Sequence, residues 1–198
     1  MALTEILQAS GSQYGYIAKL RTDAAGRSYQ QCLAISDISW DETTRAFYQA
    51  NAPQGMATIH SVCISKRKGE RKQAVPAVTL REDFGVENDA HAGSGRQVSL
   101  LALEGVERMR EKLATIVPGD FAENLTVQGL NDLHLAPGDR IRVGDSALLE
   151  VTQIGKECHG HSCAIMQAVG TCVMPKEGVF AKVLTGGPVK PGDAVTLA

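Results

Sequence analysis

This sequence has few aromatic residues, almost no net charge and no long apolar segment. Aromatic residues make up 5% of its 198 residues, with a single tryptophan. The formal net charge is −2, so a general nucleic-acid-binding protein, which needs a strongly basic surface, is excluded. No run of about 18 apolar residues occurs, and we therefore expect no membrane-spanning helix.

Two further features of the sequence concern the location of the protein. The N-terminus lacks the basic and apolar regions of a secretory signal. The five cysteines are an odd number, in a chain long enough to form a core without disulfides. Both features lead us to expect a cytoplasmic protein with reduced thiols.

The chain after residue 56 has the pattern of a mainly β protein. We expect strands at 58–65, 75–80, 97–102, 140–143, 147–154 and 194–197. Pro-Gly-Asp sequences begin at Pro118, Pro137 and Pro191, and Pro followed by Gly favours a type II turn. Short strands between such turns indicate a barrel or a curled sandwich. We expect one helix at 104–116, packed through Val106, Met109, Leu113 and Ile116.

Residues 1–56 form a separate segment that resembles no family we can name. We expect short helices at 3–9 and 41–50, and a hairpin of strands at 14–21 and 28–35. The stretch 52–55 contains Pro and Gly and marks the boundary with a β-rich domain at 57–198. The segment therefore adds α and β elements to a mainly β protein.

The chemically richest stretch of the sequence is at 158–172. It contains three of the five cysteines and two of the five histidines. Lys156 precedes Cys158 by two residues, and nearby positive charge favours the reactive thiolate over the thiol. Thiolates and imidazoles also bind zinc in tetrahedral sites. The candidate metal ligands are Cys158, His159, His161, Cys163 and Cys172.

The order of several motifs resembles the MOSC domain, which forms the C-terminal part of molybdenum-cofactor sulfurases and also occurs as stand-alone bacterial proteins. The resemblance covers about residues 57–198. It is carried by Ile64-Ser65-Lys66, Asp89-Ala90-His91-Ala92-Gly93, Gly119-Asp120-Phe121-Ala122-Glu123-Asn124-Leu125-Thr126, Leu135-Ala136-Pro137-Gly138-Asp139, Val151-Thr152-Gln153 with Cys158, and 174–181.

The resemblance implies a β-barrel with a few helices and a role connected with the molybdenum cofactor. Cys158 occupies the position proposed in the family to carry sulfur or to contact molybdenum. The residues expected to bind the cofactor are Lys66, Asp89, His91, Arg96, Glu123 and Asn124. The partner would be a cysteine desulfurase or a molybdenum-cofactor enzyme. The family is also linked to pyridoxal-phosphate sulfurases, although this chain is too short to contain that fold.

Three alternatives remain open from the sequence. Cys158 could carry a persulfide in sulfur transfer, or ligate molybdenum in a small reductase. The chain departs from the family in having Ile154-Gly155-Lys156-Glu157 before that cysteine and extra His and Cys residues after it. These additions support a third reading, a zinc-binding or redox-sensing module without catalysis. The sequence does not specify the oligomeric state.

Overall fold

The fold is known from a computed structural model, which describes residues 7–8, 16–22, 28–34, 57–156 and 164–198. The chain divides into two compact units, Met1–Gln54 and Gly55–Ala198. We describe each unit by itself.

In the first unit, the described residues form three short strands in antiparallel pairs. Strand β1 (Leu7–Gln8) pairs with β2 (Tyr16–Thr22), and β2 pairs with β3 (Ser28–Ala34). The predicted hairpin is therefore confirmed. The expected helix at 3–9 is wrong for residues 7 and 8, because a single turn or two of helix is unstable alone and the backbone here pairs with a neighbouring strand. The helix expected at 41–50 lies outside the described residues.

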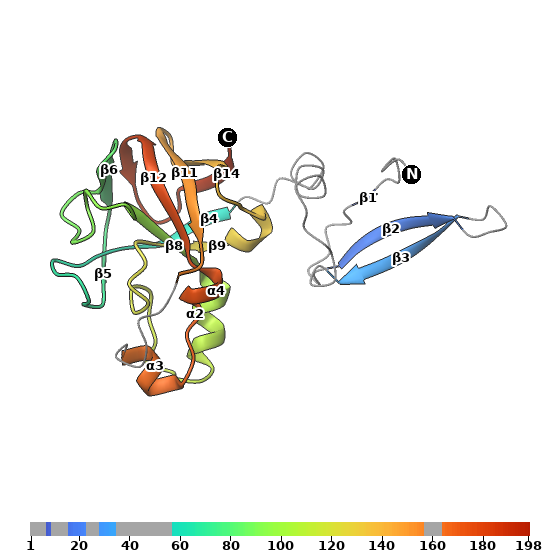
Figure 1. The fold of residues 1–198 in the computed structure, drawn as a ribbon, viewed down its shortest axis with the longest axis horizontal. Helices are drawn as coiled ribbons and strands as arrows, with labels where there is room; N and C mark the ends of the chain where they lie inside the picture. Colours follow the sequence, from blue (N-terminus) through green and yellow to red (C-terminus); the bar gives the residue numbers. More distant parts are fainter. Residues whose placement is uncertain (1–6, 9–15, 23–27, 35–56, 157–163) are drawn as a thin grey trace. The chain divides into compact units, whose positions relative to one another are not determined.

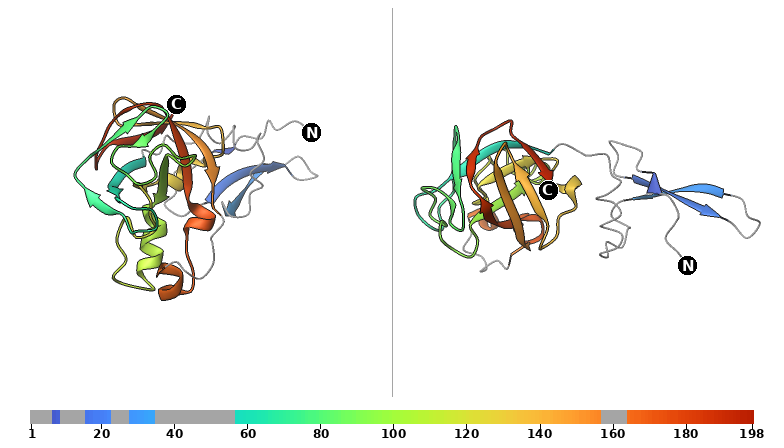
Figure 2. Two further views of the ribbon diagram at one scale, coloured as in Figure 1. Left: turned by 60° about the vertical axis from the view of Figure 1, so that its left-hand side comes forward. Right: turned by 90° about the horizontal axis from the view of Figure 1, so that it is seen from above.

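The second unit is a closed β-barrel (Figures 1 and 2). Its sheet runs in the order β14-β10-β11-β12-β8-β9-β4-β5, and β14 also pairs with β4. This pairing closes a ring of seven strands and leaves β5 outside it. The strands are β4 (Ala57–Ile64), β5 (Gln73–Val75), β8 (Val98–Ala102), β9 (Leu125–Gln128), β10 (Arg140–Val143), β11 (Ala147–Ile154), β12 (Val179–Thr185) and β14 (Ala194–Leu197).

The β8–β9 pair is parallel, and the other strand pairs of the barrel are antiparallel. A small second sheet contains β6 (Val78–Arg81), β7 (Gly85–Val86) and β13 (Gly187–Val189). The expected single strand at 75–80 is thus two strands in different sheets. Pro76 lies between them, and a proline has no backbone N–H to continue a ladder.

Two apolar cores hold this unit together. The larger core fills the barrel with Val, Ile and Leu side chains from its strands. The smaller core lies under the helices α2 (Leu103–Arg110), α3 (Ala164–Val169) and α4 (Met174–Glu177), which gather at one end of the barrel in Figures 1 and 2. The prediction of a mainly β barrel with a few helices is confirmed.

Helix α2 is shorter than the sequence predicted, but its apolar stripe packs as expected. Val106, Met109 and Ile116 are buried in the smaller core, and Leu113 packs against it. The helix ends at Arg110, whose Nε donates to the carbonyl of Ile116 at 2.9 Å. This bond holds the chain as it turns back toward the barrel.

The three Pro-Gly-Asp turns have the same conformation. Gly119, Gly138 and Gly192 have φ values of +94°, +95° and +91°. In each turn the Asp amide donates to the carbonyl of the residue before Pro, and the Asp Oδ2 accepts the amide of that same residue. The predicted type II geometry is therefore confirmed, and the carboxylates explain why Asp follows Gly.

Candidate functional site

A buried ion pair joins two segments that are distant in the sequence. Lys72, just before β5, donates from its Nζ to the Oδ2 of Asp89 in the loop between β7 and β8. The Lys72 side chain is 1% exposed and that of Asp89 is 0% exposed. Isolated buried charges are very unfavourable, so these two residues depend on each other.

The Asp89 carboxylate also organises the loop around it. Its Oδ2 accepts the amide of Ser65 and its Oδ1 accepts the amide of His91, both at 3.0 Å. Burial would raise the pKa of this carboxyl group, but the bonds from Lys72, Ser65 and His91 outweigh it and lower the pKa below its ordinary value. Asp89 is therefore a fixed anion that holds the loop onto the end of β4.

The pKa of the Lys72 amine is also lowered by its surroundings. Burial lowers this pKa, while the hydrogen bond and the charge of Asp89 oppose that shift. Lys72 belongs to a basic run that also contains Lys66, Arg67, Lys68 and Arg71. From the sequence this run could be either a solvated loop or a cradle for an anionic ligand. Those four other residues are exposed. No local pattern distinguishes the buried member of this run, because its partner is 17 residues away.

Glu123 and Asn124 directly precede β9, and both are buried. The Glu123 carboxylate accepts the amides of Gly119 and Phe121 and the hydroxyl of Thr126. Burial raises its pKa despite these bonds. Asn124 accepts from the amide and hydroxyl of Ser99. Its Nδ2 donates to the carbonyl of Cys63. These contacts hold the loops in place, and a direct contact of either residue with a cofactor stays a prediction.

The loop of Asp89 and the segment of Glu123 meet at Lys72. The amide of Lys72 donates to the carbonyl of Gly119 at 2.9 Å, and the amide of Gly119 donates to Glu123. Gly119 lies so close to Lys72 that an added Cβ would overlap the Lys72 carbonyl oxygen. The structure thus brings the two predicted segments together, through a residue that the sequence analysis did not select.

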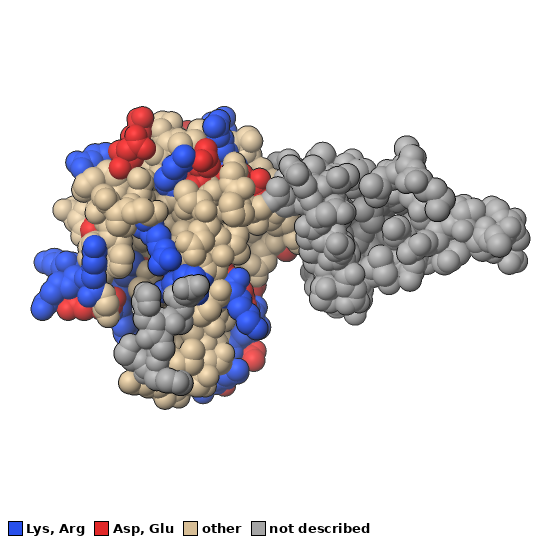
Figure 3. All heavy atoms as spheres, in the orientation of Figure 1, with Lys and Arg blue, Asp and Glu red and all other residues tan. Residues whose placement is uncertain are grey.

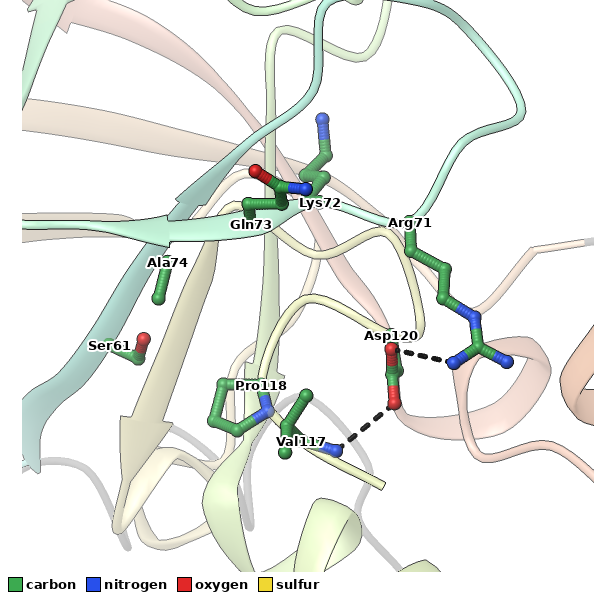
Figure 4. Close-up of a pocket in the computed structure, with 8 residues that line it drawn as sticks. All are labelled: Ser61, Arg71, Lys72, Gln73, Ala74, Val117, Pro118 and Asp120. Atoms are coloured by element: carbon green, nitrogen blue, oxygen red, sulfur yellow. Dashed lines mark hydrogen bonds and ion pairs between the residues drawn. The ribbon is translucent and has the colours of Figure 1, made fainter. Parts of the chain in front are cut away.

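Two surface pockets flank β5. One, of about 400 Å³, lies between β5 and the turn at 117–120, and the ion pair of Arg71 with Asp120 borders it (Figure 4). The Lys72 ammonium points away from the apolar Val117 and Pro118 in that view.

The other pocket, of about 450 Å³, lies on the β4–β5 hairpin, where basic side chains gather (Figure 3). Its polar lining includes Ser65, Lys66, Arg67, Glu70 and Arg71.

Ser65 has an unusual position in the second pocket. The residue is 6% exposed, and its buried Oγ has no hydrogen-bond partner among the described residues. A buried hydroxyl normally has a partner, since leaving it unpaired is costly. A hydroxyl beside Lys66 and Arg67 therefore suits an anionic ligand.

Arg96 links the end of the Asp89 loop to β12. Its guanidinium lies over the ring of Phe180, 5.1 Å from the ring centroid. Two residues before Phe180, the carbonyl of Gly178 accepts the amide of Gly155 at 2.6 Å. The amide of Lys156 donates to the carbonyl of Pro175 at 3.3 Å. The chain leading to Cys158 is therefore anchored to the segment 175–178, just before β12.

Most of the predicted metal ligands lie outside the described residues. These are Cys158, His159, His161 and Cys163. Cys172 is half-buried and packs against the smaller core. Within the described part of the chain, no group of three or more His, Cys, Asp or Glu residues is placed to hold a metal ion. The zinc site stays a prediction.

Cys63 has the properties of a structural cysteine. It is fully buried in β4, with its Sγ 3.6 Å from the Ser61 hydroxyl. Burial raises the pKa of its thiol to about 11, and the Glu123 carboxylate adds to the shift. Cys63 is therefore a thiol at neutral pH and lacks the nucleophilic thiolate form.

Comparison with protein families identifies the domain. The profile of the MOSC domain matches residues 87–196. The chain belongs to the MOSC domain family. Members of this family are linked to proteins related to molybdenum-cofactor sulfurases. No curated protein matches the sequence.

Solved structures share the MOSC fold at low sequence identity. The YuaD protein from Bacillus subtilis has a TM-score of 0.59 and 18% identity, over 73% of this chain and 97% of that one. YiiM from Geobacillus stearothermophilus has a TM-score of 0.54 and 22% identity, over 72% and 75% of the two chains. YiiM from Escherichia coli has a TM-score of 0.51 and 19% identity, over 74% and 70%. No helix among the described residues is long and apolar enough to cross a membrane.

Proposed function

We propose that this MOSC domain binds the molybdenum cofactor and uses the Cys158 thiolate either to ligate molybdenum or to carry a persulfide sulfur. The observation that supports this proposal is the convergence of segments around β5 and β12. Lys72 and Ser65 tie the β4–β5 hairpin to the Asp89 loop. Arg96, at the end of that loop, stacks on Phe180 of β12, the strand that pairs with β11 before Cys158.

The groups around this centre fit an anionic pterin cofactor. Lys66 and Arg96 are exposed cations, His91 is partly exposed, and Ser65 has a hydroxyl without a partner among the described residues. In our proposal Lys66 and Arg96 hold the phosphate through charge-assisted hydrogen bonds. Asp89 holds the loop that presents His91. Glu123 holds the turn behind Lys72, and Asn124 joins Ser99 of β8 to Cys63 of β4. When bound, the cofactor supplies redox chemistry at its metal.

The thiolate of Cys158 does the chemistry that belongs to this chain. In the persulfide reading it attacks the outer sulfur of a donor persulfide. A new S–S bond forms at Cys158, the donor S–S bond breaks, and the donor leaves as a thiolate. No net oxidation takes place in this exchange. If Cys158 instead ligates molybdenum, the same thiolate would bind the metal as a soft donor. Lys156 favours the anionic form in both cases.

The test is metal and persulfide analysis of the full chain, purified without oxygen from molybdenum-replete cells. We expect molybdenum with pterin, or a persulfide at Cys158 detected by mass spectrometry after thiol labelling. The Cys158→Ser variant should lose that signal at least tenfold and keep its circular dichroism spectrum.

Cys172→Ser is the matched control, because Cys172 belongs only to the alternative site. It should retain the molybdenum or persulfide of the wild type. Stoichiometric zinc that is lost in both variants would instead establish the zinc-binding module. Retention of molybdenum in Cys158→Ser, with no persulfide in the wild type, would contradict our proposal.

A further inference from the structure

His91 lies beside the buried ion pair, within reach of both its members. Its Nδ1 is 3.4 Å from the Lys72 Nζ and 3.5 Å from the Asp89 Oδ1. Its side chain is 33% exposed, whereas the side chains of Lys72 and Asp89 are almost completely buried. His91 is therefore the member of this group that a ligand can reach.

The two contacts of Nδ1 require opposite proton positions. An ammonium has three donors and no acceptor, so a hydrogen bond from Lys72 requires a bare Nδ1. A hydrogen bond to Asp89 requires a proton on the same nitrogen. A neutral imidazole carries one proton, which must be on Nδ1 or on Nε2.

Several features favour the bond from Lys72. The Asp89 Oδ1 already accepts the amide of His91 at 3.0 Å. Lys72 uses one of its three protons on the Asp89 Oδ2, which leaves donors for Nδ1. Burial, together with the charges of Lys72 and Lys68, lowers the pKa of His91, although Asp89 opposes this shift. A neutral ring is the form that can accept from Lys72.

We infer that Lys72 is a positioning residue that donates to the Nδ1 of His91 and thereby fixes the proton of His91 on Nε2. His91 then offers a single N–H donor to an anionic or carbonyl oxygen of the ligand. The assignment of that ligand as the molybdenum cofactor rests on the proposed function, whereas the proton position does not.

The position of this proton determines what His91 can do. With the proton on Nε2 the ring donates a hydrogen bond to an oxygen. With the proton on Nδ1 the bare Nε2 would be a base or a metal ligand. The inference therefore assigns His91 to ligand binding and excludes it as a proton acceptor through Nε2.

The test is ¹⁵N NMR of the histidine rings in the full chain without cofactor, at a pH above the imidazole pKa of about 6.5. His91 signals are assigned by their loss in His91→Gln. We expect a protonated Nε2 and a bare Nδ1 in the wild type. A protonated Nδ1, or an equal mixture of the two forms, would overturn the inference whether or not the cofactor binds.

The Lys72→Met variant tests the cause of this proton position. Without the ammonium, Asp89 becomes the only partner of Nδ1, and the proton should move to Nδ1. The double variant Lys72→Met/Asp89→Leu removes both partners and avoids an unpaired buried charge, so His91 should be a mixture of forms. Lys190→Met, which removes an exposed lysine, is the matched control and should leave the proton on Nε2. An unchanged Nε2 proton in a folded Lys72 variant would refute the role of Lys72.

The cofactor content gives a second readout. If the proposed function holds, the pterin content of Lys72→Met should be at least fivefold lower than that of Lys190→Met. Should Cys158→Ser keep the cofactor while His91 has the expected proton, the proposed role of Cys158 fails and the inference stands. If Cys158 binds as proposed but the proton is on Nδ1, only the inference fails.

Discussion

At the scale of single residues, the Lys72–Asp89 ion pair is distinguished among the described residues by the burial of both its side chains. Both side chains are withdrawn from water, and the carboxylate holds two backbone amides in addition to the ammonium. Removal of one partner leaves the other as an uncompensated buried charge, which typically costs about 3–5 kcal/mol.

We predict that Asp89→Asn lowers the free energy of unfolding by about 3–5 kcal/mol at neutral pH. The folded-state pKa of Asp89 is lowered, so its contribution is complete above the unfolded-state pKa of about 3.9 and disappears as the pH falls through the folded-state pKa. Denaturant unfolding of wild type and variant at several pH values measures this. A difference that does not shrink below about pH 4 would contradict the prediction.

Cysteine reactivity gives a second prediction at this scale. Because burial raises the pKa of Cys63 to about 11, the native protein should leave Cys63 unlabelled by an alkylating agent at neutral pH. We expect Cys158 to react at least tenfold faster, as a cysteine beside Lys156 should. Peptide mass spectrometry after timed labelling measures both rates, and labelling in denaturant is the control. Equal rates in the native protein would argue against a functional thiolate at Cys158.

At the scale of elements, the Pro-Gly-Asp turn at 117–120 has a contact that the other two turns lack. Gly119 and Gly138 have nearly equal positive φ values. An added Cβ at Gly119 would overlap the Lys72 carbonyl, whereas at Gly138 it would meet nothing within 4 Å. At 136–139 the turn bonds through its backbone to Val151 of β11 and leaves the Cβ side of its glycine open, whereas at 117–120 the glycine packs against Lys72 beside β5.

We predict that Gly138→Ala costs about 1–2 kcal/mol, the strain of a left-handed alanine. Gly119→Ala should cost at least about 2 kcal/mol more, since it also separates the turn from Lys72. It should lower cofactor content, whereas Gly138→Ala should not. Thermal unfolding and pterin analysis of the two variants provide the comparison. Equal destabilisation would mean that the contact of Gly119 with Lys72 is unimportant.

At the scale of the whole molecule, the described strand pairs of the barrel lie within Gly55–Ala198. The closing pair β14–β4 joins the two ends of this unit, so the barrel requires nearly all of the sequence after residue 56. Its cores are formed by residues of the same unit. The boundary between 1–56 and 57–198 stays a prediction, which a shortened chain can test.

We predict that a shortened chain of residues 55–198 folds cooperatively without the first unit. Its melting temperature should lie within a few degrees of the corresponding transition in the full chain, because no described core residue is removed. Circular dichroism and calorimetry measure this. A second shortened chain that ends at residue 193 lacks β14, and it should fail to fold. Aggregation of residues 55–198 would show that the first unit is needed for stability.

Local structure and family membership could be predicted from the amino-acid sequence. Turn geometry at Gly119, Gly138 and Gly192 follows from neighbouring residues, as does the hairpin of β2 and β3. Strands 140–143, 147–154 and 194–197 were predicted with the bounds they have. The order of the motifs identified the MOSC family before the barrel was known.

The pairing and burial of the polar residues became clear only from the folded chain. Lys72 and Asp89 are 17 residues apart, and closure of the barrel joins β4 to β14 across almost the whole domain. Asp89 and His91 stand out in the sequence as candidate site residues, whereas Lys72 is only one member of a basic run, and the burial of Glu123 has no local signature. Local propensity depends on adjacent residues, whereas burial and pairing depend on contacts between distant segments that form together on folding.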